Sequence, residues 1–204
     1  MKFQKEFLND LFDFVIHTCK IYCIDESHGL GHSMNVLYYT NEIFKNETCL
    51  EDYENIIMIS SILHDMCDKK YMNEDSGLKN IYEFLTKYPQ YISNKEIDLV
   101  LKIIKTMSYS KVKHEGFPTF ESELETLSYH IVREADLLAA YDFDRCVIFQ
   151  MLIKKGNYTD SIKIANELFE KRVTKHLEHS LFITTYGKML ALEKHQKINY
   201  SPFL

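Results

Sequence analysis

A chain of 204 residues that is 46% hydrophobic and 26% charged, with six Gly and three Pro, has the composition of an ordinary globular domain with one core. Its formal net charge of -6 at pH 7 argues against the generally basic surface by which proteins bind DNA or RNA polymers. No stretch approaches the ~20 continuous apolar residues of a membrane span, and acidic residues interrupt the apolar pattern at the amino terminus, so we expect an intracellular, cytoplasmic protein with no membrane partner.

Five cysteines, an odd number, occur without a CxxC pair or a spacing typical of a disulfide or zinc-thiolate framework. Reduced and mostly buried thiols are therefore expected. Cys19 and Cys23 share one face of the first predicted helix, in an otherwise apolar stripe, and we expect both of them in the core.

Apolar residues recur at steps of three and four along the chain, which is typical of helices that bury one face. In chain order, helices are predicted over residues 2–24, about 32–46, 51–65, about 76–87, 94–107, 121–138, 140–154, 159–171 and 174–196. The helix 51–65 is apolar almost all round, which favours a place at the centre of a bundle. The stretch 108–120, with Gly116 and Pro118, is expected to be the longest irregular loop.

No segment shows the alternation and turn chemistry of a β-hairpin, and no repeat or linker divides the chain. We therefore predict an all-α, single-domain helical bundle over residues 1–204. The part of the domain that carries the motifs is expected to cover about residues 20–150, with carboxyl-terminal helices over residues 155–197 packing on it.

Adjacent His64 and Asp65 stand where the most apolar helix ends. Divalent first-row metals accept neutral imidazole and carboxylate oxygen, but two ligands are too few for a site. Partners are available on other predicted helices: His28 and His32 are four residues apart, and Asp136 lies in a strongly apolar helix. A carboxylate in such a helix is costly unless it is paired or bound to a metal.

The set His32, His64, Asp65 and Asp136 resembles the signature of the HD-domain superfamily of metal-dependent phosphohydrolases, a His, an adjacent His-Asp and a distant Asp on a helical bundle. The likeness covers about residues 20–150. It is greatest to the nucleotide pyrophosphohydrolase-like branch, through the stretches SHGLGH, HDMCDKK and IVREAD. Departures from that branch occur at Asn35, where Arg is usual, and over residues 137–141.

The resemblance implies a bundle of the HD-domain type that holds one divalent cation, Mn, Mg, Co, Ni or Fe, on those four side chains. It also implies hydrolysis of a small phosphorylated metabolite, with a nucleotide as the first expectation, and release of phosphate or pyrophosphate by metal-activated water. Asp68 is predicted to orient or deprotonate the water. Five further side chains are predicted to bind phosphate: His28, Lys69, Lys70, Arg133 and Arg145.

Several of these residues have a second interpretation. One of the two lysines is expected to be a solvated surface residue, and the two arginines can instead form ion pairs with Glu134, Asp142 or Asp144. His28 is expected to change charge near neutrality. Of the many tyrosines, Tyr71 and Tyr109 are placed to pack on a nucleobase. His176 and His179 are a weak metal pair, which we set aside.

The sequence also leaves two alternative functions and one oligomeric state open. A di-iron oxygenase of the HD type would need further ligands, for which the sequence offers His28, Asp68 and His114. A nucleotide sensor without turnover would keep the same pocket. A homodimer is the assembly that the sequence leaves open.

Overall fold

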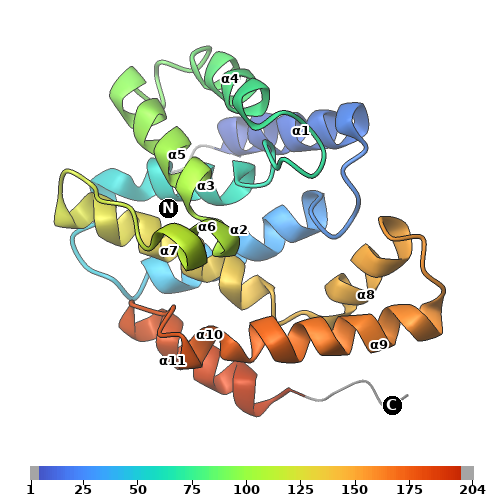
Figure 1. Cartoon of the computed structure of the whole chain (residues 1–204). Helices are drawn as coiled ribbons and strands as arrows, with labels where there is room; N and C mark the ends of the chain where they lie inside the picture. The colour runs from blue at the N-terminus through green and yellow to red at the C-terminus, as the bar shows by residue number, and fades with distance from the viewer. Residues whose placement is uncertain (1–4, 199–204) are drawn as a thin grey trace.

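This computed structural model describes residues 5–198, which form helices joined by turns and irregular loops, and no strand occurs among them (Figure 1). In chain order the elements are α1 (Lys5–Tyr22), α2 (Leu30–Phe44), η1 (Glu51–Tyr53), α3 (Glu54–Leu63), α4 (Glu74–Leu85), α5 (Asn94–Thr106), α6 (Tyr109–Glu115), α7 (Glu123–Ala139), α8 (Phe143–Leu152), α9 (Tyr158–Leu168), η2 (Phe169–Val173), α10 (Lys175–Glu178) and α11 (Thr185–Gln196). The predicted all-α bundle is confirmed.

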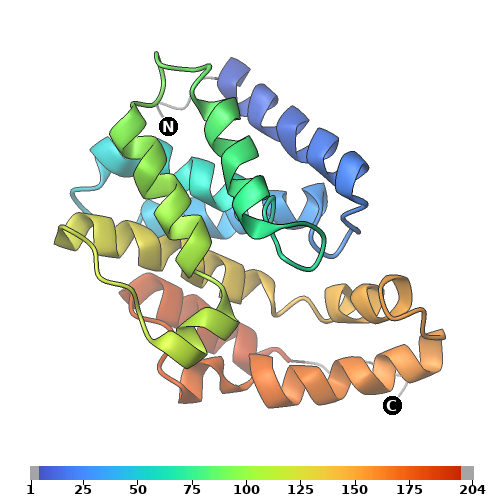
Figure 2. The same ribbon diagram turned by 45° about the horizontal axis from the view of Figure 1, so that its top comes forward.

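Helix α3 lies at the centre, as its apolar sequence predicts. Every residue of α3 except Asn55 is buried, and the helix packs against α1, α2, α5 and α7. Fully burying one of its isoleucine side chains contributes about 1.5–3 kcal/mol. In Figure 2, α1, α4 and α5 lie on one side of the central helices, and α9, α10 and α11 lie on the other.

Helices α2 and α7 pack against each other, and both contact α3. The carboxyl end of α3 therefore points into the space between two neighbours. That arrangement decides the position of the site, because the residues that follow Leu63 enter the interior of the bundle and not solvent.

Helices α8 and α9 form an antiparallel pair beside the main bundle (Figure 1). Their contact buries a small apolar cluster of Val147, Ile162 and Ala165, separate from the main core. After α9 the helix widens into the π-helical turn η2 before α10 begins. This pair and this turn supply one side of the cavity described below.

The predicted irregular loop 108–120 is wrong in part, since it contains α6. The Ser108 side chain accepts a hydrogen bond from the Lys111 N–H at the start of α6, and Gly116 ends the helix with φ +79°. A serine N-cap at the start of a helix and a glycine with positive φ at its end are common helix-terminating features.

The predicted helix 174–196 is interrupted between α10 and α11. The backbone N–H groups of Ile183 and Thr184 donate to Glu134 Oε1 at 2.6 and 3.1 Å, and Arg133 donates to the Leu181 carbonyl. Two buried side chains of α7 thus satisfy backbone groups that a continuous helix would pair internally. The other helices are confirmed with shifted ends, and residues 2–4 of the first lie outside the described residues.

The prediction of mostly buried thiols is wrong. All five cysteines are unpaired, but Cys67 alone is buried, whereas Cys23 and Cys49 are exposed. Cys19 is half-buried and packs against the core, so only one of the two residues expected there contacts it. Separately, no helix over residues 5–198 combines the length and the apolar character that crossing a membrane requires.

Candidate metal centre and adjoining cavity

The predicted ligand side chains converge from α2, the end of α3 and α7. The Nε2 atoms of His32 and His64 lie 3.0 Å apart. Asp65 Oδ2 lies 3.3 Å from each of these nitrogens. Asp136 Oδ1 lies 3.3 Å from the Nε2 of His32 and 3.8 Å from that of His64. Residues 32, 64, 65 and 136 therefore meet in one place, as the sequence predicts.

These separations fit the ligands of a single ion. Bonds of about 2.1 Å put neighbouring ligand atoms roughly 3.0 Å apart in an octahedral site and roughly 3.4 Å apart in a tetrahedral one. One ligand atom from each of His32, His64 and Asp136 lies within 4.8 Å of the others. Asp65 Oδ2 is buried without a hydrogen-bond partner among the described residues. An orphaned carboxylate oxygen facing two imidazole nitrogens fits a cation that all of them share.

The local fold prepares His64 as a ligand. Its Nδ1 lies 2.9 Å from the Ser61 carbonyl oxygen, which can only accept, so Nδ1 carries the hydrogen. Nε2 is then the nitrogen that faces the cluster, where it can bind a cation once it has lost its proton. A backbone carbonyl in this position fixes the tautomer and the ring orientation of metal-binding histidines generally.

Charge within the cluster follows from burial and from the mixture of acids and imidazoles. Burial alone would lower the pKa of His64, but the Asp65 and Asp136 carboxylates raise it to about 9. Burial likewise opposes ionisation of both carboxyls, yet the neighbouring histidines hold the pKa of Asp65 and of Asp136 below its usual value. A proton and a cation thus compete for the same imidazole nitrogen, while both carboxylates stay ionised.

A cavity of about 200 Å³ opens beside the cluster, with Asp136 in its wall. Lys70, Arg145 and Arg172 supply positive charge to this cavity. Apolar side chains, including Phe149 and Val173, cover much of the remaining wall. Only Asp136 of the four cluster residues lines the cavity, so it joins the cluster to the space where a ligand would lie.

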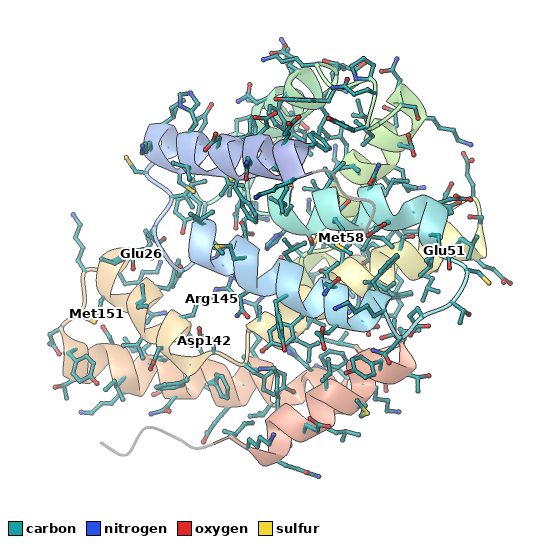
Figure 3. The ribbon with its side chains drawn as sticks, turned by 180° about the vertical axis from the view of Figure 1, so that it is seen from behind. Glu26, Glu51, Met58, Asp142, Arg145 and Met151 are labelled. Carbon is teal, nitrogen blue, oxygen red and sulfur yellow. The ribbon has the colours of Figure 1, made fainter. Side chains whose placement is uncertain are left out.

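A wider recess of about 770 Å³ lies on the other side of Arg145. Figure 3 labels Arg145 and Asp142 near the start of α8, close to the turn that carries Glu26 and leads into α2, and all three residues line this recess. The recess also borders Asn35, the position where the resembling branch has Arg. Arg145 therefore separates two openings that lead towards the cluster.

His28 lines the cavity but does not change charge near neutrality, so that prediction is wrong. Its Nε2 lies 2.9 Å from Lys70 Nζ, and its Nδ1 lies 2.6 Å from Ser27 Oγ. Burial, together with the positive charges of Lys70 and Arg145, lowers the pKa of His28 to about 4. The imidazole is neutral, and its Nε2 lone pair accepts from the lysine ammonium.

Lys70 and Lys69 have different surroundings. Lys70 Nζ lies 3.1 Å from Asp68 Oδ2, and the Lys70 backbone N–H donates to Asp68 Oδ1 at 2.8 Å. Both lysines are exposed, but only Lys70 lines the cavity, so Lys69 is the surface residue of the pair. The contact that the structure gives Asp68 is to Lys70, and its predicted role towards a water stays a prediction.

The two arginines separate in the same way. Arg133 is 1% exposed and donates to the Leu181 carbonyl, and its Nη2 lies 3.4 Å from Glu134 Oε1. It is a structural ion-pair partner, so the prediction that it binds phosphate is wrong. Arg145 lines the cavity, its Nε donates to the Ser27 carbonyl, and its Nη1 lies 4.0 Å from Asp136 Oδ1.

Three residues of the cavity wall were not predicted as one site: Tyr109, Arg172 and His176. The sequence predicts that Tyr109 and Tyr71 can pack on a nucleobase. Tyr109 lines the cavity, whereas Tyr71 donates to Asp25 and is not part of the wall. The sequence offers one signal for Arg172, since the chain has only three arginines. The structure places two of them, Arg145 and Arg172, in the wall of this cavity. The spacing of His176 and His179 gave no such signal.

Comparison with known proteins shows the fold and no more. Neither the family models nor the curated proteins compared with this sequence give a match. Among solved structures, the chain is similar to a crystal structure of a protein from Lactobacillus plantarum, a structural genomics target, with a TM-score of 0.70 and 17% sequence identity. The alignment covers 95% of this chain and 92% of that chain, so the two share the whole helical bundle.

Proposed function

We propose that this chain is a divalent-metal-dependent phosphohydrolase of the HD-domain type, acting on a small phosphorylated metabolite, with a nucleotide as the first expectation. The observation that carries the proposal is the cluster of two imidazoles and two carboxylates that shares Asp136 with a cavity lined by cations. The ligand chemistry of the cluster suits a divalent ion, and the charge of the cavity suits phosphate.

Each part of the cluster has a defined task in this proposal. His32, His64, Asp65 and Asp136 would hold the ion. The chemistry that a divalent ion supplies when bound here is activation of water for attack on phosphorus and neutralisation of phosphate charge. The Ser61 carbonyl keeps the His64 lone pair directed at the cluster.

Phosphate binding falls to Lys70 and Arg145. Asp68 and the neutral His28 hold the Lys70 ammonium from two sides, which fixes a flexible side chain in the cavity wall. The Ser27 carbonyl holds Arg145 Nε, and its Nη1 lies 4.0 Å from Asp136 Oδ1. A guanidinium oriented in this way can meet two phosphate oxygens at once.

The di-iron alternative receives less support from the same contacts. Over residues 5–198, the group of metal-binding side chains with mutually close ligand atoms is His32, His64 and Asp136, enough for one ion. The further ligands it would need are engaged or remote: Lys70 contacts both His28 and Asp68, and His114 is exposed on α6.

The experiment is an assay of phosphorylated metabolites with Mn²⁺, Co²⁺, Ni²⁺ and Mg²⁺ separately. We expect metal-dependent release of phosphate or pyrophosphate, lost in Asp65→Asn, because a carboxamide binds a divalent cation more weakly than a carboxylate. The matched control is Asp98→Asn, which makes the same change at an exposed position of α5. Full activity in Asp65→Asn would end the proposal, and tight nucleotide binding without hydrolysis of any compound would favour the sensor.

A further inference from the structure

The cavity has a second polar side that the phosphate chemistry does not use. Tyr109 from α6, Arg172 from η2 and His176 from α10 form it, and we call these residues the η2 wall. We propose that the η2 wall recognises the leaving group of the substrate, as a planar heterocycle that carries both N–H and C=O groups on its edge. This inference rests on the proposed function. It concerns the part of the substrate that would not contact the metal centre.

The His176 side chain is the first observation. It is 1% exposed and lines the cavity, yet neither of its ring nitrogens has a hydrogen-bond partner among the described residues. Buried polar groups in folded proteins are nearly always paired, and an unpaired one costs stability. Its neighbours Tyr109 and Tyr141 make ring–ring contacts with the imidazole and no hydrogen bond to it. A bound ligand would therefore supply the hydrogen-bond partners of both ring nitrogens.

The protonation state of His176 defines what that ligand must offer. Burial, and next the positive charge of Arg172, lower the pKa of His176 to about 3, so its ring is neutral. A neutral imidazole has one N–H donor and one lone-pair acceptor. A second phosphate group can only accept hydrogen bonds and would leave the acceptor nitrogen unused. A group with adjacent N–H and C=O satisfies both kinds of partner.

Arg172 is the second observation. Its guanidinium lies over the Tyr109 ring, 4.4 Å from the ring centroid, and no ion pair with a carboxylate occurs for it within residues 5–198. It belongs to a π-helical turn, a conformation that is rare and frequent at functional sites. A planar donor held against an aromatic face, but unpaired, is suited to a carbonyl on the edge of a ring.

The surface between the two polar sides is apolar and supports a flat ring. Leu137, Phe149, Leu168 and Val173 line it. A volume of about 200 Å³ is smaller than the range of about 300–1,000 Å³ typical of pockets for drug-sized ligands. One compact heterocycle with its phosphate fits this description better than a dinucleotide does.

The test measures binding without turnover. Calorimetric titration of the chain with uridine, guanosine and their monophosphates is compared with ribose 5-phosphate and fructose 1,6-bisphosphate. We expect saturable binding of the nucleosides at millimolar concentration or below, weakened about tenfold in Arg172→Met and in His176→Leu. Lys171→Met is the matched control, since it removes the neighbouring exposed charge outside the cavity.

A second readout separates recognition from structure. Because His176 is buried without partners, His176→Leu should melt at the same temperature as the unchanged chain or higher, while losing nucleoside binding. Clearly lower melting of that variant would show a structural role for the imidazole and overturn the inference.

The other outcomes are equally decisive. Unchanged nucleoside affinity in both variants, no nucleoside binding by the unchanged chain, or a preference for the bisphosphate that depends on Arg172 would each overturn the inference. Because these titrations need no hydrolysis, failure of the activity assay together with nucleoside binding that depends on the η2 wall would reject the proposed enzyme and keep the subsite.

Discussion

Single side chains decide whether the cluster can hold a cation. His64 is the clearest case, because the Ser61 carbonyl fixes its tautomer and its Nε2 lies 3.0 Å from that of His32. Asp136 belongs to the cluster and also lines the cavity. Substitutions at these residues should therefore affect metal binding before they affect folding.

Metal binding should stabilise the chain by mass action. Divalent ion at about 100 times its Kd should add about 2.7 kcal/mol to the free energy of unfolding. We expect Co²⁺, Ni²⁺ or Mn²⁺ to raise Tm, with EDTA reversing the effect, and His64→Gln to abolish it. His17→Gln, at an exposed position of α1, serves as the control. An unaltered Tm shift in His64→Gln would contradict the assignment of that ligand.

The Asp68 carboxylate has two possible roles, to hold Lys70, which it contacts, or to act on a water molecule. If Asp68 acts by holding Lys70, Asp68→Asn should raise KM with little change in kcat, and Lys70→Met should do the same. The double variant should then be no worse than Lys70→Met alone. We expect this result from steady-state kinetics. A large fall in kcat for Asp68→Asn would instead support the role towards water that the sequence predicts.

At the level of elements, α7 connects the cluster to the carboxyl-terminal helices. Its Glu134 is fully buried and accepts from the backbone of Ile183 and Thr184 and from the Thr184 hydroxyl. Its neighbour Arg133 donates to the Leu181 carbonyl. The interruption between α10 and α11 is therefore a tertiary feature, specified by a helix some 50 residues earlier in the sequence.

Glu134→Gln should destabilise the chain by about 1–3 kcal/mol, because it leaves buried hydrogen-bond partners and Arg133 poorly satisfied. Urea unfolding measures the loss, and faster hydrogen exchange in α11 should accompany it. Glu193→Gln, at an exposed position of α11, should change the free energy of unfolding by no more than about 0.5 kcal/mol. Equal stability of the two variants would show that the buried contacts do not hold the interruption.

Element ends show what a one-dimensional pattern can and cannot predict. The signals for α6, Ser108 before it and Gly116 after it, stand in the sequence and could have been used. The segment between α10 and α11 is different, because Arg133 and Glu134 from another helix satisfy its backbone groups. Periodicity predicted α3 and its central position correctly, since a helix that is apolar on all sides has only one stable location.

Over the whole molecule, the site is predictable to the extent that its residues carry their own signal. His64 and Asp65 are conspicuous because polar groups end an apolar helix. The η2 wall is not, because Tyr109 of α6 meets Arg172 and His176 only through the packing of distant segments. The neutrality of His28 likewise depends on burial and on cations from other segments, which the sequence does not reveal.

Stability should fall as the pH is lowered, because the buried His176 has a folded-state pKa of about 3. An unfolded histidine titrates near 6.5, so this contribution is present above pH 6.5 and is lost as the pH falls towards the folded value. At pH 5 the loss is about 2 kcal/mol. Urea unfolding at pH 7 and pH 5 should show a smaller loss in His176→Leu, by about that amount, than in the unchanged chain or in His179→Gln, at an exposed position.

The buried contacts of Glu134 also decide where the chain can be lengthened. Lys155 and Ser180 both occupy turns with positive φ, so from the backbone alone either looks like a place for an inserted domain or reporter. The turn at Lys155 joins α8 to α9 on the surface, whereas the segment after Ser180 is held by the buried side chains of Arg133 and Glu134. A fluorescent protein inserted at the first turn should leave the His–Asp cluster intact. At the second turn it would separate the segment between α10 and α11 from Arg133 and Glu134, and Glu134 lies two residues before Asp136 of the cluster.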